Sequence, residues 1–328
     1  MNAIDTRGRR QDLAARAAWL YYIKGRTQDE IAADLALSRP NVQRLVALAI
    51  SEGLIKFRLD HPLLRSLQLA ERLKDSFPIQ TCEVAPQAPD GGNPLVGIAM
   101  LAATFIETLL LAREPRVLAV GTGRTLLETV RQMPLMTRPE HKIVSIVSNL
   151  SRDGKASPYD IALRLSDRVG AQCYPLPLPL ITDTRAECDV LSAQRGYRAV
   201  AALSANADAV LFGVGNLGTT APILVDGFVT ETELGLLMKD GAIGEIVSRC
   251  FNRKGVLIDN AVTERLTAFP MTPGPTRPAV MVAMGSSKVA AIRAALLGRF
   301  ATGLITDETT AASLLEEDAT KFPLDRAG

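Results

Sequence analysis

The chain has 328 residues, 47% of them hydrophobic and 22% charged, with a formal net charge of +2. This length predicts two or more domains with a large core. No uninterrupted apolar run of about 18 residues occurs, which excludes a membrane-spanning helix. The four cysteines are isolated from one another, which argues against a disulfide framework or a metal site. The polar N-terminus lacks a signal segment, so we expect a cytoplasmic protein.

The first elements in the chain predict two short helices. A helix is expected over residues 12–24, ending at Gly25. Thr27 and Glu30 form a T-x-x-E capping box, which predicts that the next helix starts at Thr27. The apolar residues of this second helix lie on one face: Ile31, Ala32 and Leu35.

A third helix follows a tight turn. Ser38 can cap it, and Pro40 is tolerated in its first turn, where no backbone donor is missed. Gly53 is expected to end it. Its buried stripe has the i, i+3, i+4, i+7 spacing of an amphipathic helix: Val42, Leu45, Val46 and Ala49. Its first turns carry a polar outer face: Arg39, Asn41, Gln43 and Arg44.

These elements predict a helix-turn-helix that binds operator DNA. In such a motif the start of the second helix reaches base edges in the major groove, where Arg suits guanine and Asn or Gln suits adenine. Thr27 and Ser38, at the two helix starts, complete the candidate DNA-binding residues. Residues 54–59 alternate apolar and basic, which predicts a wing beside the phosphates. The alternative is an ordinary three-helix packing unit with a polar surface.

Charge distribution supports the DNA-binding interpretation modestly. Residues 1–60 hold 10 Lys and Arg against 7 Asp and Glu, a net of +3, whereas the rest of the chain has a net of −1. We therefore expect a small all-α winged helix-turn-helix domain at residues 1–60. Residues 61–93 are expected to be a linker, with a helix over 61–77 and a Pro- and Gly-rich turn region over 84–94.

Strands alternate with helices in residues 94–328. Helices are expected over 94–112 and over 157–169, the latter capped by Ser157, and Asp307 is expected to cap the last helix. Alternation of this kind predicts an α/β domain built on a mostly parallel sheet that is covered on both faces. The expected strands are 116–120, 143–147, 209–212, 279–284 and 303–306.

Three of these strands run into glycine-containing turns, and ligands bind beyond the carboxyl ends of strands in open α/β sheets. A helix start there offers free N–H groups and a partial positive charge to an anion. Any single turn could be structural, but together they predict one pocket that binds a phosphate or a polyol. The residues concerned are Gly121, Thr122, Gly123, Arg124 and Thr125 after the first strand, Gly213, Gly215 and Asn216 after another, and Lys288 after Gly285.

The order and spacing of several motifs resemble the SorC/DeoR family of bacterial sugar-responsive transcriptional regulators over nearly the whole chain. The motifs are LSRPNVQRLVALAISEGLIKF, VLAVGTGRTLLETV, VLFGVGNLG, DGAIGEI and GSSKVAAIRAALLGRFATGLITDETTAASLL. The resemblance implies a helix-turn-helix joined to an effector domain with the fold of ribose-5-phosphate isomerase and glucosamine-6-phosphate deaminase. It also implies a homo-oligomer, typically a tetramer, whose operator binding responds to a sugar or sugar phosphate.

The resemblance also implies roles for single residues. Gly121 to Thr125 would cradle the effector, Glu245 would contact sugar hydroxyls, and Lys288 would be the cation of the pocket. Residues 149–152, beginning with Asn149, depart from the glycine-rich turn of many relatives, and Arg124 replaces a small residue. The segment 148–184 is most similar to regulators of polyol catabolism operons, so a free sugar alcohol stays open beside a sugar phosphate.

The sequence leaves two other functions open. An enzyme of the same fold, such as a sugar-phosphate isomerase or deaminase, needs a general base and usually a paired acid in its pocket. The chain has two histidines, of which His61 falls in the expected linker and His141 in an expected solvated loop. A DNA-binding protein with a purely structural oligomerisation domain is the other alternative. We expect a regulator without catalytic residues, metal or cofactor.

Overall fold

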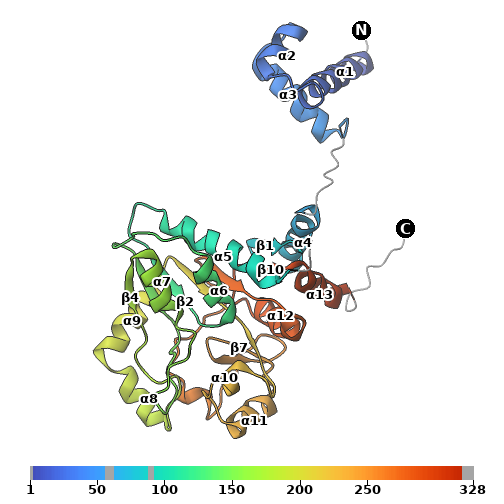
Figure 1. Ribbon diagram of the computed structural model, residues 1–328. Coiled ribbons are helices and arrows are strands. Elements are labelled where there is room, and N and C mark those ends of the chain that lie inside the picture. The colour runs from blue at the N-terminus through green and yellow to red at the C-terminus, as the bar shows by residue number, and fades with distance from the viewer. Residues whose placement is uncertain (1–2, 56–62, 88–91, 320–328) are drawn as a thin grey trace. The chain divides into compact units, whose positions relative to one another are not determined.

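The computed structural model describes residues 3–55, 63–87 and 92–319. The chain forms two compact units, Met1–His61 and Pro62–Gly328 (Figure 1). The larger unit holds every strand that the structure describes, whereas the described part of the smaller unit is helical.

The smaller unit consists of α1 (Ala3–Tyr22), α2 (Gln28–Leu35) and α3 (Arg39–Ser51). Thr27 caps α2 with both halves of the capping box, since its side chain accepts from the Glu30 backbone N–H while the Glu30 carboxylate accepts from the Thr27 N–H. Ile31 and Val42 are fully buried where α2 and α3 pack together. Each such side chain contributes about 1.5–3 kcal/mol through burial.

Several details of this unit differ from the prediction. The helix α1 begins well before residue 12, and its buried face is formed by Ala14, Ala17 and Ala18, whereas Leu13 is exposed. These small side chains let the backbone of α1 approach α3 closely. Ser38 holds the N-cap position of α3, but its side chain makes no capping hydrogen bond. Most of the predicted wing, residues 56–59, lies outside the described residues.

The larger unit is built on a seven-stranded sheet in which every pair of strands is parallel. This confirms the predicted α/β class with a mostly parallel sheet. The strands, in spatial order, are β1 (Thr81–Ala85), β10 (Gly303–Asp307), β9 (Ala279–Val282), β5 (Ala209–Phe212), β2 (Val117–Val120), β3 (Lys142–Ser145) and β4 (Gln172–Tyr174).

Helices cover both faces of this sheet, because successive residues of a strand point to opposite sides. Leu118 and Val120 of β2 pack toward α5 (Pro94–Leu110), α6 (Arg124–Gln132) and α7 (Ile161–Val169). Ala119 points to the other face, which is covered by α4 (Leu63–Ser76), α9 (Arg195–Ala205), α12 (Val289–Leu297) and α13 (Glu308–Ala319). The strands are therefore buried on both sides, which explains their continuous apolar runs.

A second, three-stranded antiparallel sheet was not predicted. It is formed by β6 (Gly215–Asn216), β7 (Gly244–Ile246) and β8 (Arg249–Phe251). Its strands are two or three residues long, too short to show an alternating pattern. The larger unit also contains the short helices α8 (Arg185–Ser192), α10 (Pro222–Val225), α11 (Glu231–Lys239), η1 (Thr263–Arg265) and η2 (Ser286–Lys288).

Local differences in the larger unit have simple causes. The helix expected over 61–77 is present as α4, but the segment expected as a linker also contributes β1, which was not predicted and pairs with β10 at the edge of the large sheet. The helix expected from Ser157 starts at Ile161 instead, because the Asp160 carboxylate accepts from the Leu163 N–H at 3.1 Å. Asp307 does cap the last helix, accepting from the Thr310 N–H at 3.3 Å.

His141 is buried, not solvated as we expected, with 3% of its surface exposed. Its Nδ1 accepts from the Arg116 N–H at 3.1 Å, and Nε2 lies 2.9 Å from the Leu110 carbonyl oxygen. These contacts require the tautomer with the proton on Nε2. Both ring nitrogens therefore bind backbone groups, and this histidine has a structural role.

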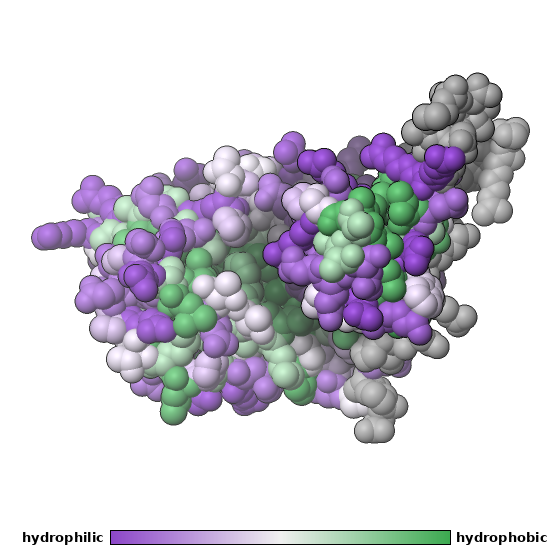
Figure 2. Space-filling model, turned by 90° about the horizontal axis from the view of Figure 1, so that it is seen from above, coloured by the Kyte–Doolittle hydropathy of each residue, from purple (hydrophilic) through white to green (hydrophobic). Residues whose placement is uncertain are grey.

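The surface face shown in Figure 2 is mostly hydrophilic, with apolar residues gathered in a few places between polar ones. In the described part of the chain, no helix is both long enough and apolar enough to cross a membrane. The most apolar helix, α5, buries Ile98, Ala102 and Ile106 against the large sheet.

Candidate functional site

A cavity of about 360 Å³ opens at the carboxyl ends of the central strands. The chain passes from β2 to β3 and β4 on one side and then continues with β5 and β9 on the other, so the order of strands reverses between β2 and β5. Ligands of open α/β sheets bind at such a switch point. The walls come from the turns after β2, β3 and β5, from residues 220–228 around α10, and from the turn between β7 and β8.

The start of α6 forms one wall. Gly123 is its N-cap, has φ +129°, and leaves open space where a Cβ would stand. No side chain caps this end, so the first backbone N–H groups of α6, those of Arg124, Thr125 and Leu126, lack helical partners. All three residues line the cavity. The turn thus presents N–H donors and a partial positive charge to a ligand.

Glu245 enters the cavity from β7. Its Oε2 accepts from the Ser248 N–H at 2.7 Å. Gly215, opposite it in β6, provides the space, since a Cβ there would overlap the Glu245 carboxylate. Val247 and Ser248 have φ +46° and +68°, conformations that are costly for residues other than glycine. Strained backbone of this kind is typical of functional sites, and both residues line the cavity.

Four charged side chains share the cavity: Arg124, Asp226, Glu245 and Lys288. Burial raises the pKa of Glu245, and the Ser248 hydrogen bond and Lys288 oppose this shift. Burial lowers the pKa of Lys288, opposed by Glu245 and reinforced by Arg124. Burial likewise raises the pKa of Asp226, which Arg124 and Lys155 oppose. Perturbed titrations in a cleft are a signature of binding and active sites.

The two cations are available to a ligand. Within the described residues, neither Lys288 nor Arg124 makes a side-chain hydrogen bond or a salt bridge. Partly buried cations normally have such partners. The cavity therefore offers two cations and the N–H donors of α6 to a phosphate or hydroxyl group, and two carboxylates as acceptors for hydroxyl groups.

The structure gathers most of the predicted effector-binding residues in this cavity. Those that line it are Thr122, Gly123, Arg124, Thr125, Gly213, Gly215, Glu245 and Lys288. Three others lie outside it. Gly121 packs under Phe212, Asn216 belongs to β6, and the Asn149 side chain donates to Asp160 at 2.8 Å.

Sequence reasoning missed the opposite wall. Tyr159 comes from the loop after β3, and Asp226 and Phe228 come from the segment around α10. No pattern near these residues marks them as ligand contacts. The Asp226-Gly227 pair indicates only a turn, in which Gly227 has φ +76°.

The predicted DNA-binding residues lie on the smaller unit. Four are exposed on the outer face of the first turns of α3: Arg39, Asn41, Gln43 and Arg44. Arg39 lies 3.7 Å from Asp29, with both side chains mostly exposed. Thr27 is engaged in the capping box of α2, so its hydroxyl has a structural partner already. Within the described part of the smaller unit, the outer face of α3 is therefore exposed, with Arg39 in a solvent-exposed ion pair.

Comparison with known proteins identifies a family and several relatives of this chain. A family described as "Putative sugar-binding domain" matches residues 61–316. The erythritol catabolism regulatory protein EryD of Brucella abortus is 33% identical over 303 residues, 92% of this chain and 96% of that protein. The deoxyribonucleoside regulator of Bacillus subtilis is 26% identical over 312 residues, 94% and 98% of the two chains.

A solved structure has the same fold. The full-length sorbitol operon regulator SorC of Klebsiella pneumoniae superposes with a TM-score of 0.70 at 22% identity, covering 93% of this chain and 99% of that chain.

Proposed function

This chain belongs to the SorC/DeoR family of sugar-binding transcriptional regulators, and on that premise we propose that α3 binds operator DNA while the cavity binds the effector. The effector is a sugar, a sugar alcohol or a sugar phosphate. The observation that carries the proposal is the cavity itself, where Glu245, Lys288 and the uncapped start of α6 converge at the switch point of the sheet.

The DNA-binding role is proposed for the smaller unit as a winged helix-turn-helix domain. Its second helix starts at the predicted capping box, and the exposed polar residues at the start of the third helix, α3, are of the types that recognise base edges. Asn41 and Arg44 lie one turn apart on this face. They are the residues we propose to contact bases, whereas Thr27 and Ser38 position the helix starts.

The effector class follows from the chemistry of the cavity. A polyhydroxylated ligand needs both acceptors and donors, and Glu245, Asp226 and the α6 N–H groups supply them. The names of two relatives refer to sugar alcohols, erythritol and sorbitol. The cations Lys288 and Arg124 would also suit a phosphate, so the proposal covers both forms of the ligand.

Regulation requires that the effector bind two states of the protein with different affinity. Couplings of this kind are about 1–3 kcal/mol, or about 5- to 150-fold in operator affinity. We expect the active form to be a cytoplasmic homo-oligomer, a tetramer as the family resemblance implies. The proposal is of a regulator and not an enzyme, since the relatives are named as regulators and His141, whose ring nitrogens bind backbone groups, does not line the cavity.

The test combines two measurements on the full-length protein. Operator fragments are first recovered from genomic DNA by binding selection. A thermal-shift screen with erythritol, sorbitol and their monophosphates then identifies ligands, since a ligand at 100 times its Kd adds about 2.7 kcal/mol of stability. Fluorescence anisotropy with the operator follows. A ligand that stabilises the protein and changes operator affinity is the expected result. Unchanged operator affinity with bound ligand would instead favour a sensor uncoupled from DNA.

A further inference from the structure

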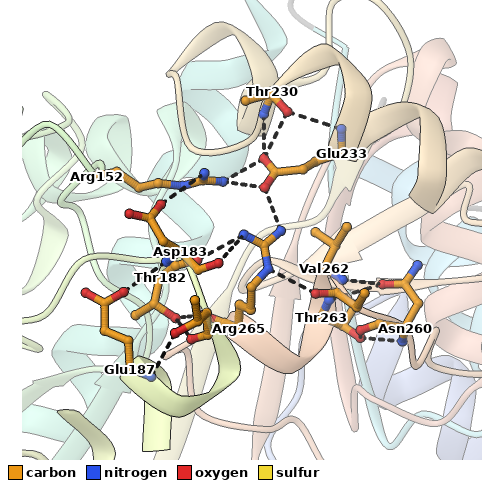
Figure 3. Close-up of polar contacts among 12 residues, drawn as sticks. Arg152, Thr182, Asp183, Glu187, Thr230, Glu233, Asn260, Val262, Thr263 and Arg265 are labelled. Carbon is orange, nitrogen blue, oxygen red and sulfur yellow. Dashed lines mark hydrogen bonds and ion pairs between the residues drawn. The ribbon is translucent and has the colours of Figure 1, made fainter. Parts of the chain in front are cut away.

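An ion-pair network centred on Glu233 joins three separate segments of the larger unit (Figure 3). Glu233 lies in the first turn of α11, and both its carboxylate oxygens accept from Arg152 Nη2, at 2.5 and 2.6 Å. Arg265 of η1 donates to the same carboxylate at 2.6 Å. The Thr230 N–H donates from the capping box at 2.8 Å. One carboxylate is therefore shared by two guanidinium groups and a helix N-terminus.

The carboxylate is well shielded from solvent, with 11% of its side chain exposed. Burial alone would raise the pKa of Glu233, but hydrogen bonds from Arg152, the Thr230 backbone and Arg265 outweigh burial and hold the pKa at about 2. Charge-assisted bonds of this kind are among the stronger ones in proteins. Removing one member leaves buried charge without its partner, which is costly.

The segments that hold the network also line the cavity. Arg152 belongs to the loop after β3, which contributes Ser148 and Tyr159. The cavity wall formed by residues 220–228 runs directly into the Thr230 cap of α11. Arg265 donates to the Thr182 carbonyl at 3.0 Å, two residues beyond Leu180 of the cavity lining. Each of the three charged residues thus lies on, or contacts, a segment that borders a different wall of the cavity.

We propose that the Arg152–Glu233–Arg265 network is a latch that holds the 220–228 wall against the loop after β3, and that effector affinity depends on it. Glu233 and Arg152 act as positioning residues, since neither lines the cavity. The inference rests on the proposed function, because it concerns how one wall of the same effector site is held in place.

The first test needs no ligand. Amide hydrogen exchange is measured on wild type, Glu233→Gln and Arg152→Met, because exchange reports local opening of a segment. We expect peptides covering residues 220–229 to exchange about tenfold faster or more in both variants, with β2 unchanged. Arg152→Met keeps the Glu233–Arg265 pair and so provides a folded variant if Glu233→Gln is too unstable. Unchanged exchange at 220–229 in a folded variant would overturn the latch.

A matched control comes from Arg116→Met. Arg116 pairs with Asp208 at 2.9 Å, and its side chain is 37% exposed compared with 30% for Arg152, but the pair lies at the amino ends of β2 and β5, opposite the cavity. Its loss should lower stability without changing exchange at 220–229 or the affinity for effector. If Arg116→Met produces the same changes as Arg152→Met, the effect is general destabilisation and the latch is wrong.

The second test measures binding of erythritol and of erythritol 4-phosphate by calorimetry. For the ligand that wild type binds, we expect Arg152→Met to raise the Kd about tenfold. Arg152→Lys should recover part of the loss, since lysine restores the charge but lacks the second guanidinium nitrogen, which lies 3.6 Å from Asp183. Because the two residues act through one contact, the double variant with Glu233→Gln should lose little more than either single variant. An unchanged Kd overturns the latch.

Binding of neither ligand to wild type would count against a four-carbon polyol as the effector, while the exchange test still decides the latch.

Discussion

Replacing Glu233 by Gln should remove a pH-dependent part of the stability of the larger unit. The network holds the pKa of Glu233 at about 2, compared with an ordinary value of 4.5. Since one pKa unit corresponds to about 1.36 kcal/mol, the ionised carboxylate contributes about 3 kcal/mol at neutral pH. The glutamine variant keeps the shape and most contacts of the side chain but leaves Arg265 without a countercharge and Arg152 with only the exposed Asp183, at 3.6 Å.

The direction of the pH effect follows from the lowered pKa in the folded state. Above about pH 4.5 the carboxylate is ionised in both states, so the contribution is complete. As pH falls from 4.5 toward 2, the carboxylate becomes protonated in the unfolded chain while it stays ionised in the folded protein. Protonation therefore favours unfolding, and the contribution of Glu233 to the free energy of unfolding is lost. We therefore expect the difference in unfolding free energy between wild type and Glu233→Gln to shrink by about 3 kcal/mol over this range.

Urea denaturation at a series of pH values measures this difference. The single tryptophan, Trp19, lies in the smaller unit, so its fluorescence follows that unit, while far-UV circular dichroism is dominated by the larger one. The fluorescence transition should coincide in wild type and variant and serves as an internal control. A difference in the dichroism transition that stays constant between pH 6 and pH 3 would refute the reasoning, because it would mean that Glu233 stabilises the fold by packing alone.

Three further predictions concern the two proposed binding surfaces. Asn41→Ala or Arg44→Ala should weaken operator binding by about 1–3 kcal/mol and relax sequence preference, measured by anisotropy on matched and substituted operators; unchanged preference in both variants would defeat the role of α3. Gly123→Val should abolish the effector response while DNA binding remains, because its side chain enters open space beside the α6 donors, at a backbone cost of about 1–3 kcal/mol; a normal response would place the ligand elsewhere. Lys288→Met should weaken a phosphorylated effector by about 2–5 kcal/mol and a neutral polyol far less, in calorimetry with matched ligands; equal losses for both would remove a phosphate role from Lys288.

Local signals in the sequence were sufficient for much of the fold. The capping box of Thr27 and Glu30 defines the start of α2 because both partners lie within one turn. The short apolar runs of β2, β5 and β9 could be recognised because strands buried on both faces carry apolar residues continuously. The glycine turn at residues 121–125 could be predicted to be part of a ligand site, because ligands of parallel sheets bind after strand ends.

Cases where the local signals competed were decided by the tertiary structure. Ser157 and Asp160 can both cap a helix, and Asp160 does so in the fold, while the Ser157 hydroxyl accepts from the Tyr159 N–H at 3.3 Å. His141 precedes a strand in a polar stretch, yet it is buried because the Leu110 carbonyl and the Arg116 N–H need partners there. The environment of His141 cannot be read from neighbouring residues, since both of its partners belong to other segments. Asp160 caps its helix by a local contact, and the Asn149 side chain from the loop after β3 also donates to it.

The residues around the cavity also divide into those that the sequence indicates and those that only the tertiary structure brings together. The chain itself marks Gly123 and Lys288 as candidates, because strand ends and helix starts can be read locally, whereas Glu245 was indicated by the family resemblance. The opposite wall and its latch could not be read in this way. Arg152 meets Glu233 across 81 positions and Arg265 meets it across 32. Such contacts form only when the segments fold together. Because the shared carboxylate is buried, its hydrogen bonds are strengthened and can hold the segments in place.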